Sequence, residues 1–162
     1  MLIIKNKLIN IINKKYYLLF FLLYLTVLLG FYFDEDNLGG AMHDATFHFK
    51  ISEEFNKDFY QAFLSWGNSD EGGNRNSPVF WIFLPFLNEY FSYNFIRLLN
   101  SLVIFAIAII FYKTLLLKYK DIPQYILVIL SSFIFLSPSL RTLAIWPYSL
   151  IWGLFFFILS IY

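Results

Sequence analysis

Two histidines and an aspartate occur within six consecutive residues of a chain that is 59% hydrophobic. They are His43, Asp44 and His48, in the stretch AMHDATFHFKI. Residues four positions apart lie on the same face of a helix, so Asp44 and His48 would project together. A carboxylate in such a pair can abstract a proton, bind a metal ion or cap a helix. The element that carries the pair therefore decides its chemistry.

Three interpretations of Asp44 remain open from the sequence. Asp44 could be the N-cap or a first-turn acid of a helix, a common role for aspartate. It could join His43 and His48 in a metal site, although His43 would point away on a helix and no third ligand has convincing spacing. It could also be a general base at a membrane interface, where a carboxylate that loses part of its hydration accepts a proton more readily.

Composition points to a lipid bilayer as the solvent of this chain. The mean hydropathy is +0.63 and only 14% of the residues are charged. The chain has no cysteine, which excludes disulfides and thiolate metal sites. Nine of the eleven acidic residues lie between Asp34 and Glu71, so the charges report membrane topology and give no sign of nucleic-acid binding. We expect an all-α integral membrane protein.

Four uncharged or nearly uncharged runs predict about four transmembrane helices, at residues 16–33, 90–112, 122–137 and 146–162. Lysines gather before the first run, in residues 1–15, and between the second and third, in residues 113–121. The positive-inside rule puts these two segments in the cytoplasm, and therefore residues 34–89 and the turn 138–145 outside. The last run ends at Tyr162 without a flanking anchor, so we expect this chain to be the N-terminal part of a longer protein.

The predicted outer loop contains an amphipathic helix at residues 44–64. Apolar residues recur there at every fourth position, which is typical of a helix lying on the membrane surface; they are Phe47, Ile51, Phe55, Phe59 and Phe63. Residues 78–87 are apolar but too few to cross a bilayer, so they would dip into the interface or start the second spanning helix. Residues 66–78 are rich in Gly, Asn and Ser and predict a flexible loop.

Directly after the first predicted span come Asp34, Glu35 and Asp36. An acid-x-acid pattern holds a metal ion and a nucleotide in soluble sugar transferases. Three acids at this place more often form the polar edge of the membrane, so we assign no metal site and no cofactor here.

The order of these segments resembles the start of the GT-C class of membrane glycosyltransferases, which includes protein O-mannosyltransferases and dolichyl-phosphate-sugar-dependent transferases. HDATFHFKISEEFNKDFYQAF stands in place of the family's acidic helix, and RNSPVFWIFLPF in place of its proline segment. FIRLLNSLVIF is similar to the family's second span, and LSPSLRTLAIWPYSLIW to its later proline and arginine turn. The chain departs from the family where Ala45 follows Asp44 and where Asn76 and Ser77 precede Pro78.

The resemblance implies an inverting transfer of a sugar from a polyprenyl-phosphate donor to an acceptor hydroxyl on the extracytoplasmic side. Asp44 would be the catalytic base, and Arg97 or Arg141 would stabilise the departing phosphate. His48 would orient Asp44 or contact substrate. For each arginine, a side chain that reaches lipid phosphates from a helix end is the competing interpretation.

The partners implied are a polyprenyl-phosphate-linked sugar, the lipid bilayer, and either missing C-terminal helices or a second membrane protein. The protein would be a multi-pass protein of the cell inner membrane, or of the endoplasmic reticulum in a eukaryote, with its N-terminus in the cytoplasm. The alternative is a small non-catalytic membrane protein whose outer loop binds an assembly partner.

Overall fold

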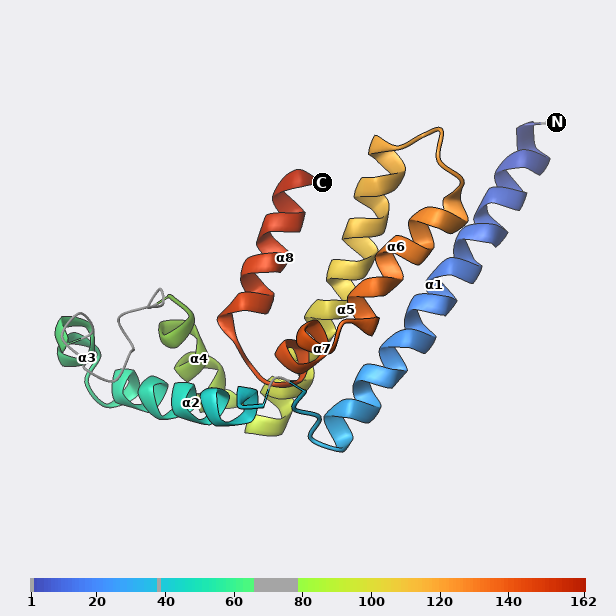
Figure 1. The fold of residues 1–162 in the computed structure, drawn as a ribbon. Coiled ribbons are helices and arrows are strands. Elements are labelled where there is room, and N and C mark those ends of the chain that lie inside the picture. The colour runs from blue at the N-terminus through green and yellow to red at the C-terminus, as the bar shows by residue number, and fades with distance from the viewer. Residues whose placement is uncertain (1, 38, 66–78) are drawn as a thin grey trace.

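The computed structural model describes residues 2–37, 39–65 and 79–162, and the regular secondary structure in them is entirely α-helical. The helices are α1 (Leu2–Tyr32), α2 (Ala41–Lys57), α3 (Phe59–Ser65), α4 (Val79–Tyr90), α5 (Tyr93–Lys118), α6 (Gln124–Leu136), α7 (Pro138–Ile145) and α8 (Ser149–Ile161). Helices α1, α5, α6 and α8 run alongside one another, whereas α2, α3 and α4 form an arm at one end of this bundle (Figure 1). The predicted all-α class is confirmed for the described residues.

Among the residues that the structure describes, two helices are long and apolar enough to cross a membrane. In α1 the window is Lys15–Tyr32, and α5 qualifies over its whole length of 26 residues, about 39 Å at 1.5 Å per residue. Helices α6 and α7 pass the same test as a pair but are bent by 59° where they meet, which makes three candidate spans if the pair counts as one. The chain is therefore a membrane protein with two or three candidate spans.

The fourth predicted span, residues 146–162, corresponds to the shorter helix α8. It has 13 residues, or about 20 Å, against roughly 30 Å of hydrocarbon in a bilayer. The difference arises because Trp146, Pro147 and Tyr148 lie before the helix, as a non-helical connection from α7. Apolar composition alone could not reveal that these residues are not helical.

Helix α5 is the centre of the bundle and packs against α1, α6, α7 and α8. Aromatic side chains fill the space between α1, α5 and α6: Phe20 lies edge-on to Tyr112, with ring centroids 5.5 Å apart, and contacts Phe135. A polar contact lies within this core, where the hydroxyls of Tyr24 and Ser101 are 2.9 Å apart and hydrogen-bonded. Two buried hydroxyls that satisfy each other add specificity to an otherwise apolar contact between helices.

Residues 138–145, predicted as a turn, form the helix α7. Pro138 occupies a first-turn position, where its missing N–H costs nothing, and Ser137 accepts a hydrogen bond from the N–H of Leu140 at 3.4 Å. Ser137 also ends α6, because its own N–H still donates to the carbonyl of Phe133. The Ser-Pro pair therefore bends the chain and starts a new helix at the same place.

Helices α2 and α3 together replace the single helix predicted at residues 44–64. Asp58 ends α2, with extended backbone angles, and begins α3 by accepting a hydrogen bond from the N–H of Gln61 on its Oδ1 at 3.0 Å. The start also differs, because α2 begins at Ala41. An aspartate side chain that caps the next helix favours ending the helix before it. The spacing of the phenylalanines, one at every fourth position, gives no sign of such a break.

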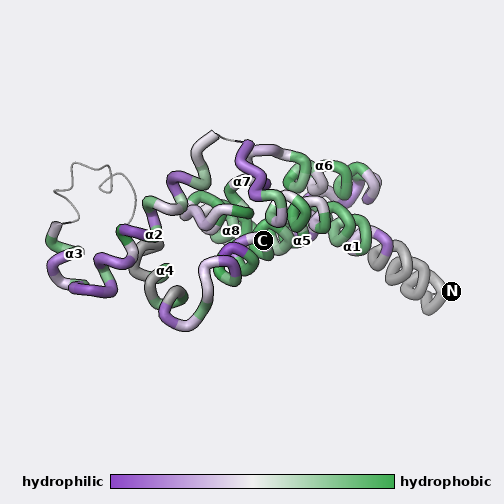
Figure 2. Tube along the Cα trace, turned by 90° about the horizontal axis from the view of Figure 1, so that it is seen from below, coloured by the Kyte–Doolittle hydropathy of each residue, from purple (hydrophilic) through white to green (hydrophobic). Residues whose placement is uncertain are grey.

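The buried face of α2 packs on protein. Phe49 lies edge-on to Tyr93, with ring centroids 4.4 Å apart, and belongs to a small core with Leu84 and Ile96. Of the predicted apolar stripe, Phe55 is buried, while Phe59 and Phe63 on α3 are about half exposed and stack on each other. Figure 2 shows the apolar residues concentrated in the bundle helices, whereas α2 and α3 carry more of the hydrophilic residues.

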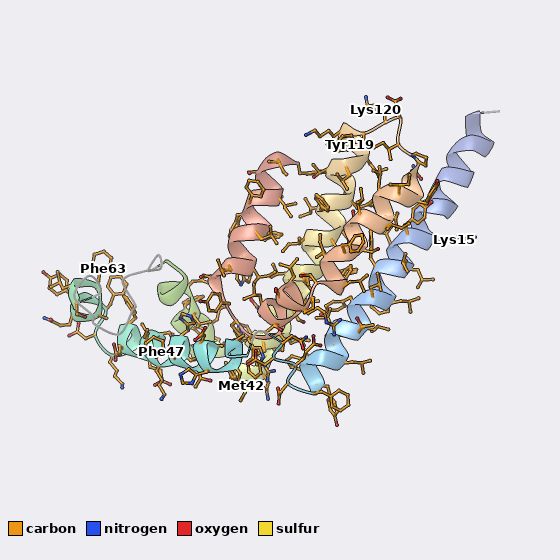
Figure 3. All side chains as sticks on the ribbon, viewed as in Figure 1. Lys15, Met42, Phe47, Phe63, Tyr119 and Lys120 are labelled. Atoms are coloured by element: carbon orange, nitrogen blue, oxygen red, sulfur yellow. The ribbon has the colours of Figure 1, made fainter. Side chains whose placement is uncertain are left out.

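The two ends of the bundle differ in what they carry. Tyr119 and Lys120 lie at the end where α5 passes to α6, whereas Met42 and Phe47 lie on the arm at the opposite end (Figure 3). The connection from α1 to α2 and the start of α5 are at the same end as α7 (Figure 1). Every segment predicted to be outside and described by the structure therefore gathers at one end; residues 66–78, including Asn76, Ser77 and Pro78, lie outside the described residues.

Candidate functional site

The acidic cluster after α1 is fully engaged with the chain itself. Asp34 accepts a hydrogen bond from Arg97, Glu35 pairs with Arg141, and Asp36 caps α2. Among the described residues, no group of three or more His, Cys, Asp or Glu side chains is close enough to hold a metal ion. This holds for the acidic cluster and for His43, Asp44 and His48 alike.

Asp36 fixes the start of α2. Its Oδ2 accepts from the N–H groups of Gly40 and Met42 at 3.1 and 3.3 Å, and its Oδ1 from that of Ala41 at 3.2 Å. The chain turns into the helix through Gly39 (φ 64°) and Gly40 (φ 146°), conformations that side chains disfavour. The carboxylate also opposes the positive end of the helix dipole. Asp36 therefore caps the helix, whereas Asp44 is an acid of its first turn, which is the other role that the first interpretation gave to Asp44.

Asp44 lies in the first turn of α2, with an exposed side chain. It lines a cavity of about 210 Å³ between the start of α2 and the connection from α7 to α8. The other walls are Leu143, Tyr148, Leu150 and the backbone around Gly39 to Ala41. An accessible carboxylate thus borders a space that is otherwise lined by backbone, two leucines and a tyrosine.

His48 is one turn further along α2 and only 6% exposed. Burial lowers the pKa of His48 to about 4, and the negative charge of Asp44 opposes this shift only in part. His48 is therefore neutral at pH 7. Its ring lies edge-on to that of Tyr148, with centroids 4.9 Å apart. The predicted proximity of Asp44 and His48 holds, but His48 is packed against the wall of the cavity, while His43 is exposed.

Tyr148 was not anticipated from the sequence, because an isolated tyrosine inside the predicted span 146–162 has no distinctive spacing. It contributes to the cavity of Asp44 and packs on His48. Burial raises the pKa of the Tyr148 hydroxyl, and the negative charge of Asp44 adds to this. The cavity therefore combines a carboxylate with a protonated phenol that can donate a hydrogen bond.

Arg97 is held in a nearly closed environment. Its side chain is 7% exposed, and its Nη2 donates to Asp34 Oδ1 at 2.7 Å. The guanidinium lies 3.8 Å from the centroid of the Trp146 ring and 4.8 Å from that of Phe31. Its Nε donates to the carbonyl of Ile145 at 3.4 Å. Arg97 thus joins the start of α5 to the segment after α1 and to the end of α7.

Arg141 makes a two-pronged pair with Glu35. Its Nε donates to Oε1 at 2.8 Å and its Nη2 to Oε2 at 2.5 Å. The same guanidinium donates to the hydroxyl and the carbonyl of Thr26 on α1, at 2.8 and 2.9 Å. The hydrogen bonds from Arg141 hold the pKa of Glu35 below its usual range. Trp146 completes this contact, since its Nε1 donates to the carbonyl of Glu35 at 3.0 Å.

The four residues predicted for the site therefore fall into two groups. Asp44 and His48 lie together at the cavity, one accessible and one buried. Arg97 and Arg141 are each paired with an acid of the cluster and do not line that cavity. Sequence reasoning missed the capping role of Asp36, the contribution of Tyr148 to the cavity and the structural role of Trp146, which is 2% exposed.

Comparison with known proteins adds no further constraint: no family model matches the chain, and neither a curated protein nor a solved structure does.

Proposed function

We propose that this chain is the N-terminal part of a GT-C type glycosyltransferase, with Asp44 as its catalytic base. The observation that carries the proposal is the accessible carboxylate of Asp44, held in the first turn of a helix at the end of a membrane bundle and facing a cavity. An acceptor must reach this carboxylate from water, and a lipid-linked donor must reach it from the bilayer. The end of a helix bundle is where both can meet.

In the proposed reaction Asp44 takes the proton of an acceptor hydroxyl. The hydroxyl oxygen then attacks the anomeric carbon of the sugar, and the bond from that carbon to the polyprenyl phosphate oxygen breaks. Configuration inverts, and the phosphate leaves with the electron pair of the broken bond. Tyr148 is suited to orient the acceptor, because a neutral phenol beside a carboxylate can donate a hydrogen bond to a sugar or acceptor oxygen.

The two arginines are better suited to holding the site than to binding phosphate directly. For Arg97 or Arg141 to meet a phosphate, its pair with Asp34 or Glu35 would have to open. Paired as they are, the guanidiniums connect the ends of α1, α5 and α7, from which the segment leading to Asp44 begins. We assign them positioning roles in this reaction.

The proposed topology has four membrane passages: α1, α5, α6 and α8, with α7 and the connection that follows it at the extracytoplasmic end. The N-terminus is cytoplasmic and the arm of α2, α3 and α4 is extracytoplasmic, with the exposed rings of Phe59 and Phe63 in the headgroup region. The two ion pairs support one sidedness for both outer segments, because they join residues 34 and 35 to α7 and to the start of α5.

The decisive experiment is Asp44→Asn in the full-length protein, assayed in membranes supplied with tritiated polyprenyl-phosphate mannose or glucose. We expect transfer to be lost while membrane insertion is unchanged. The matched control is Glu53→Gln, which removes an exposed acid of the same helix outside the cavity. Transfer that persists in Asp44→Asn would remove Asp44 from the mechanism.

A second candidate is a non-catalytic membrane protein that binds an assembly partner. The observation that favours it is the aromatic surface of α3, where Phe59, Tyr60, Phe63 and Leu64 are all more than half exposed. This candidate predicts that replacing these residues abolishes complex formation, and that no variant of Asp44 changes sugar transfer in the cell.

A further inference from the structure

The C-terminal end of α7 needs hydrogen-bond donors that its own residues do not supply. The last carbonyls of an α-helix have no partner within the helix. In α7 these include the carbonyls of Leu143, Ala144 and Ile145. In a longer helix the carbonyl of Leu143 would accept from the N–H of residue 147, but Pro147 has no N–H. The donors must therefore come from another part of the chain.

Two side chains of α5 supply these donors. Asn100 is 2% exposed, and its Nδ2 donates to the carbonyls of Leu143 and Ala144 at 2.9 and 2.8 Å. Arg97 lies three positions earlier, on the same side of α5, and its Nε donates to the carbonyl of Ile145 at 3.4 Å. The end of α7 is thus capped by side chains of α5.

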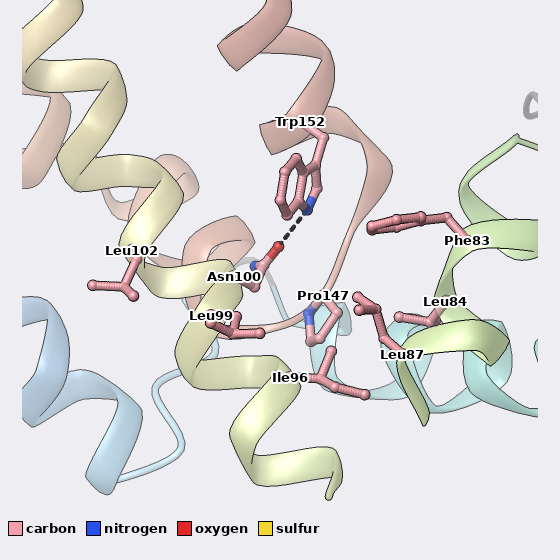
Figure 4. Close-up of a pocket in the computed structure, with 9 residues that line it drawn as sticks. All are labelled: Phe83, Leu84, Leu87, Ile96, Leu99, Asn100, Leu102, Pro147 and Trp152. Atoms are coloured by element: carbon pink, nitrogen blue, oxygen red, sulfur yellow. Dashed lines mark hydrogen bonds between the residues drawn. The ribbon is translucent and has the colours of Figure 1, made fainter. Parts of the chain in front are cut away.

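Asn100 also holds both ends of the connection that follows α7. Its Nδ2 donates to the carbonyl of Trp146 at 3.4 Å, and its Oδ1 accepts from the indole N–H of Trp152 at 2.9 Å. Trp152 belongs to the first turn of α8. Figure 4 shows the side chain of Asn100 directed from α5 toward that of Trp152. One buried amide therefore fixes the chain before and after Pro147 and Tyr148.

The segment held in this way forms one wall of the cavity of Asp44. The lining residues on that side are Leu143, Tyr148 and Leu150. Leu143 is bonded to Asn100 through its carbonyl, and the other two lie between the two ends that Asn100 holds. Asn100 itself does not line the cavity of Asp44 but a separate apolar pocket of about 250 Å³ between α4, α5 and the start of α8. It can therefore affect the cavity of Asp44 only through the wall.

The wall is held more firmly from α5 than from α2. On the side of α2, Tyr148 meets the ring of His48 in an edge-on contact with centroids 4.9 Å apart. On the side of α5, Asn100 makes four hydrogen bonds to the segment from Leu143 to Trp152. Hydrogen bonds of a buried amide are directional, and leaving one unmade is costly, whereas a ring contact tolerates a shift.

We propose that Asn100 is a positioning residue for the cavity of Asp44, and that it sets the place of Tyr148 from inside the bundle without touching the cavity. Its effect on catalysis rests on the proposed function, in which Tyr148 orients the acceptor beside Asp44. An amide suits this role because it is donor and acceptor at once, and so serves the carbonyls of α7 and the indole of Trp152 together.

The position of Tyr148 can be measured without any transfer reaction. The chain has two histidines, so the full chain with ¹³C-labelled histidine in phosphatidylcholine nanodiscs gives two ring signals. His48 lies against Tyr148 and reports the wall, and the exposed His43 is the internal reference. In the parent, His48 should stay neutral from pH 8 down to pH 5, because burial lowers its pKa to about 4.

Two variants remove different bonds of Asn100. Asn100→Asp loses the donors to α7, and Trp152→Phe loses only the indole N–H and keeps an aromatic ring. We expect each variant to move the signal of His48 and to bring part of its titration above pH 5, because a displaced Tyr148 admits water to the histidine ring. Trp152→Phe leaves the buried amide in place, so it answers the question even if Asn100→Asp does not fold.

The matched control is Ser101→Ala, at the next position of α5. Ser101 is fully buried and hydrogen-bonded to Tyr24 at 2.9 Å, away from the connection after α7. This variant removes a buried hydrogen bond of the same helix, so the melting temperature should fall. The signal and titration of His48 should stay as in the parent, which separates positioning of the cavity from a general loss of stability.

Kinetics extend the test to the proposed reaction. Asn100→Asp and Trp152→Phe should raise the KM for the acceptor by roughly tenfold and lower kcat less, because Asp44 stays in place while a hydrogen bond from Tyr148 to the acceptor is lost. Ser101→Ala should leave both constants near those of the parent.

An unchanged signal and titration of His48 in both Asn100→Asp and Trp152→Phe would overturn the positioning role. An equal change in Ser101→Ala would also overturn it, since any loosening of α5 would then move the wall. A shifted His48 in Asn100→Asp, together with undiminished transfer in Asp44→Asn, would refute the proposed base and leave the positioning of the cavity wall standing.

Discussion

The guanidinium of Arg97 lies 3.8 Å from the ring centroid of Trp146, and both side chains are almost completely buried. The contact joins the second turn of α5 to the residue that ends α7, and Asp34 closes it from the side of α1. A buried guanidinium is stabilised by a carboxylate counter-ion and by the face of an aromatic ring, and Asp34 and Trp146 provide these here.

Arg97→Lys should lower the free energy of unfolding by about 1–2 kcal/mol, because lysine loses the flat contact with Trp146 and the second hydrogen bond to Ile145. Asp34→Asn should cost less, since the side chain of Asp34 is 58% exposed and water can replace part of the pair. Thermal unfolding in detergent, followed by size-exclusion chromatography, measures both. An equal or larger loss for Asp34→Asn would contradict this account of the contact.

The pair of Glu35 and Arg141 should make stability depend on pH in the acid range. Because the pKa of Glu35 is lowered in the folded protein, the pair contributes fully above the ordinary glutamate pKa of about 4.3 and is lost as the pH falls through the folded value. Melting temperatures between pH 6 and pH 3 should therefore fall less steeply in Glu35→Gln than in the parent. The control is Glu54→Gln, at an exposed position of α2. Parallel curves for Glu35→Gln and the parent would refute the prediction.

His48 should add a second pH dependence at a higher range. Its pKa is about 4 when folded against about 6.5 when unfolded, so the unfolded chain binds the proton first as the pH falls. Stability is complete above about pH 6.5, and roughly 3 kcal/mol is lost by pH 4. The measurement compares unfolding at pH 7 and pH 5. His48→Gln should weaken the dependence, whereas His43→Gln, at an exposed position, should retain it; the reverse result would show that His48 is not buried.

Asp36→Ala should loosen the start of α2 and destabilise it by about 1–2 kcal/mol, because three backbone N–H groups lose their acceptor. Hydrogen exchange of the amides of Gly40, Ala41 and Met42 should accelerate, while exchange in α5 stays unchanged. Asp36→Asn, which keeps a capping oxygen, should lie between alanine and the parent. If Asp44→Ala had the larger effect on these amides, Asp44 would be the cap.

Sequence patterns predicted the apolar helices well because composition and length decide what can cross a bilayer, as in α5. They could not pair the charges. Glu35 and Arg141 are 106 positions apart, and nothing local to either residue indicates its partner. Two predicted segments differ from the structure because local side chains cap helices. Asp58 divides the predicted surface helix into α2 and α3. Ser137 and Pro138 start the helix α7 where a turn was expected. The position of Asp44 on a helix was predictable from spacing, but its cavity was not, because Tyr148 comes from a distant segment.

The ion pairs also set an order of events during biosynthesis. A chain emerges from its N-terminus, so Asp34 and Glu35 follow the first helix to its destination before either arginine has been made. Asp34 and Glu35 therefore have no cationic partner until Arg97 of α5 and Arg141 of α7 have been synthesised. A nascent chain that stops before residue 141 would therefore hold Glu35 without its arginine partner, and one that stops before residue 97 would hold both acids unpaired.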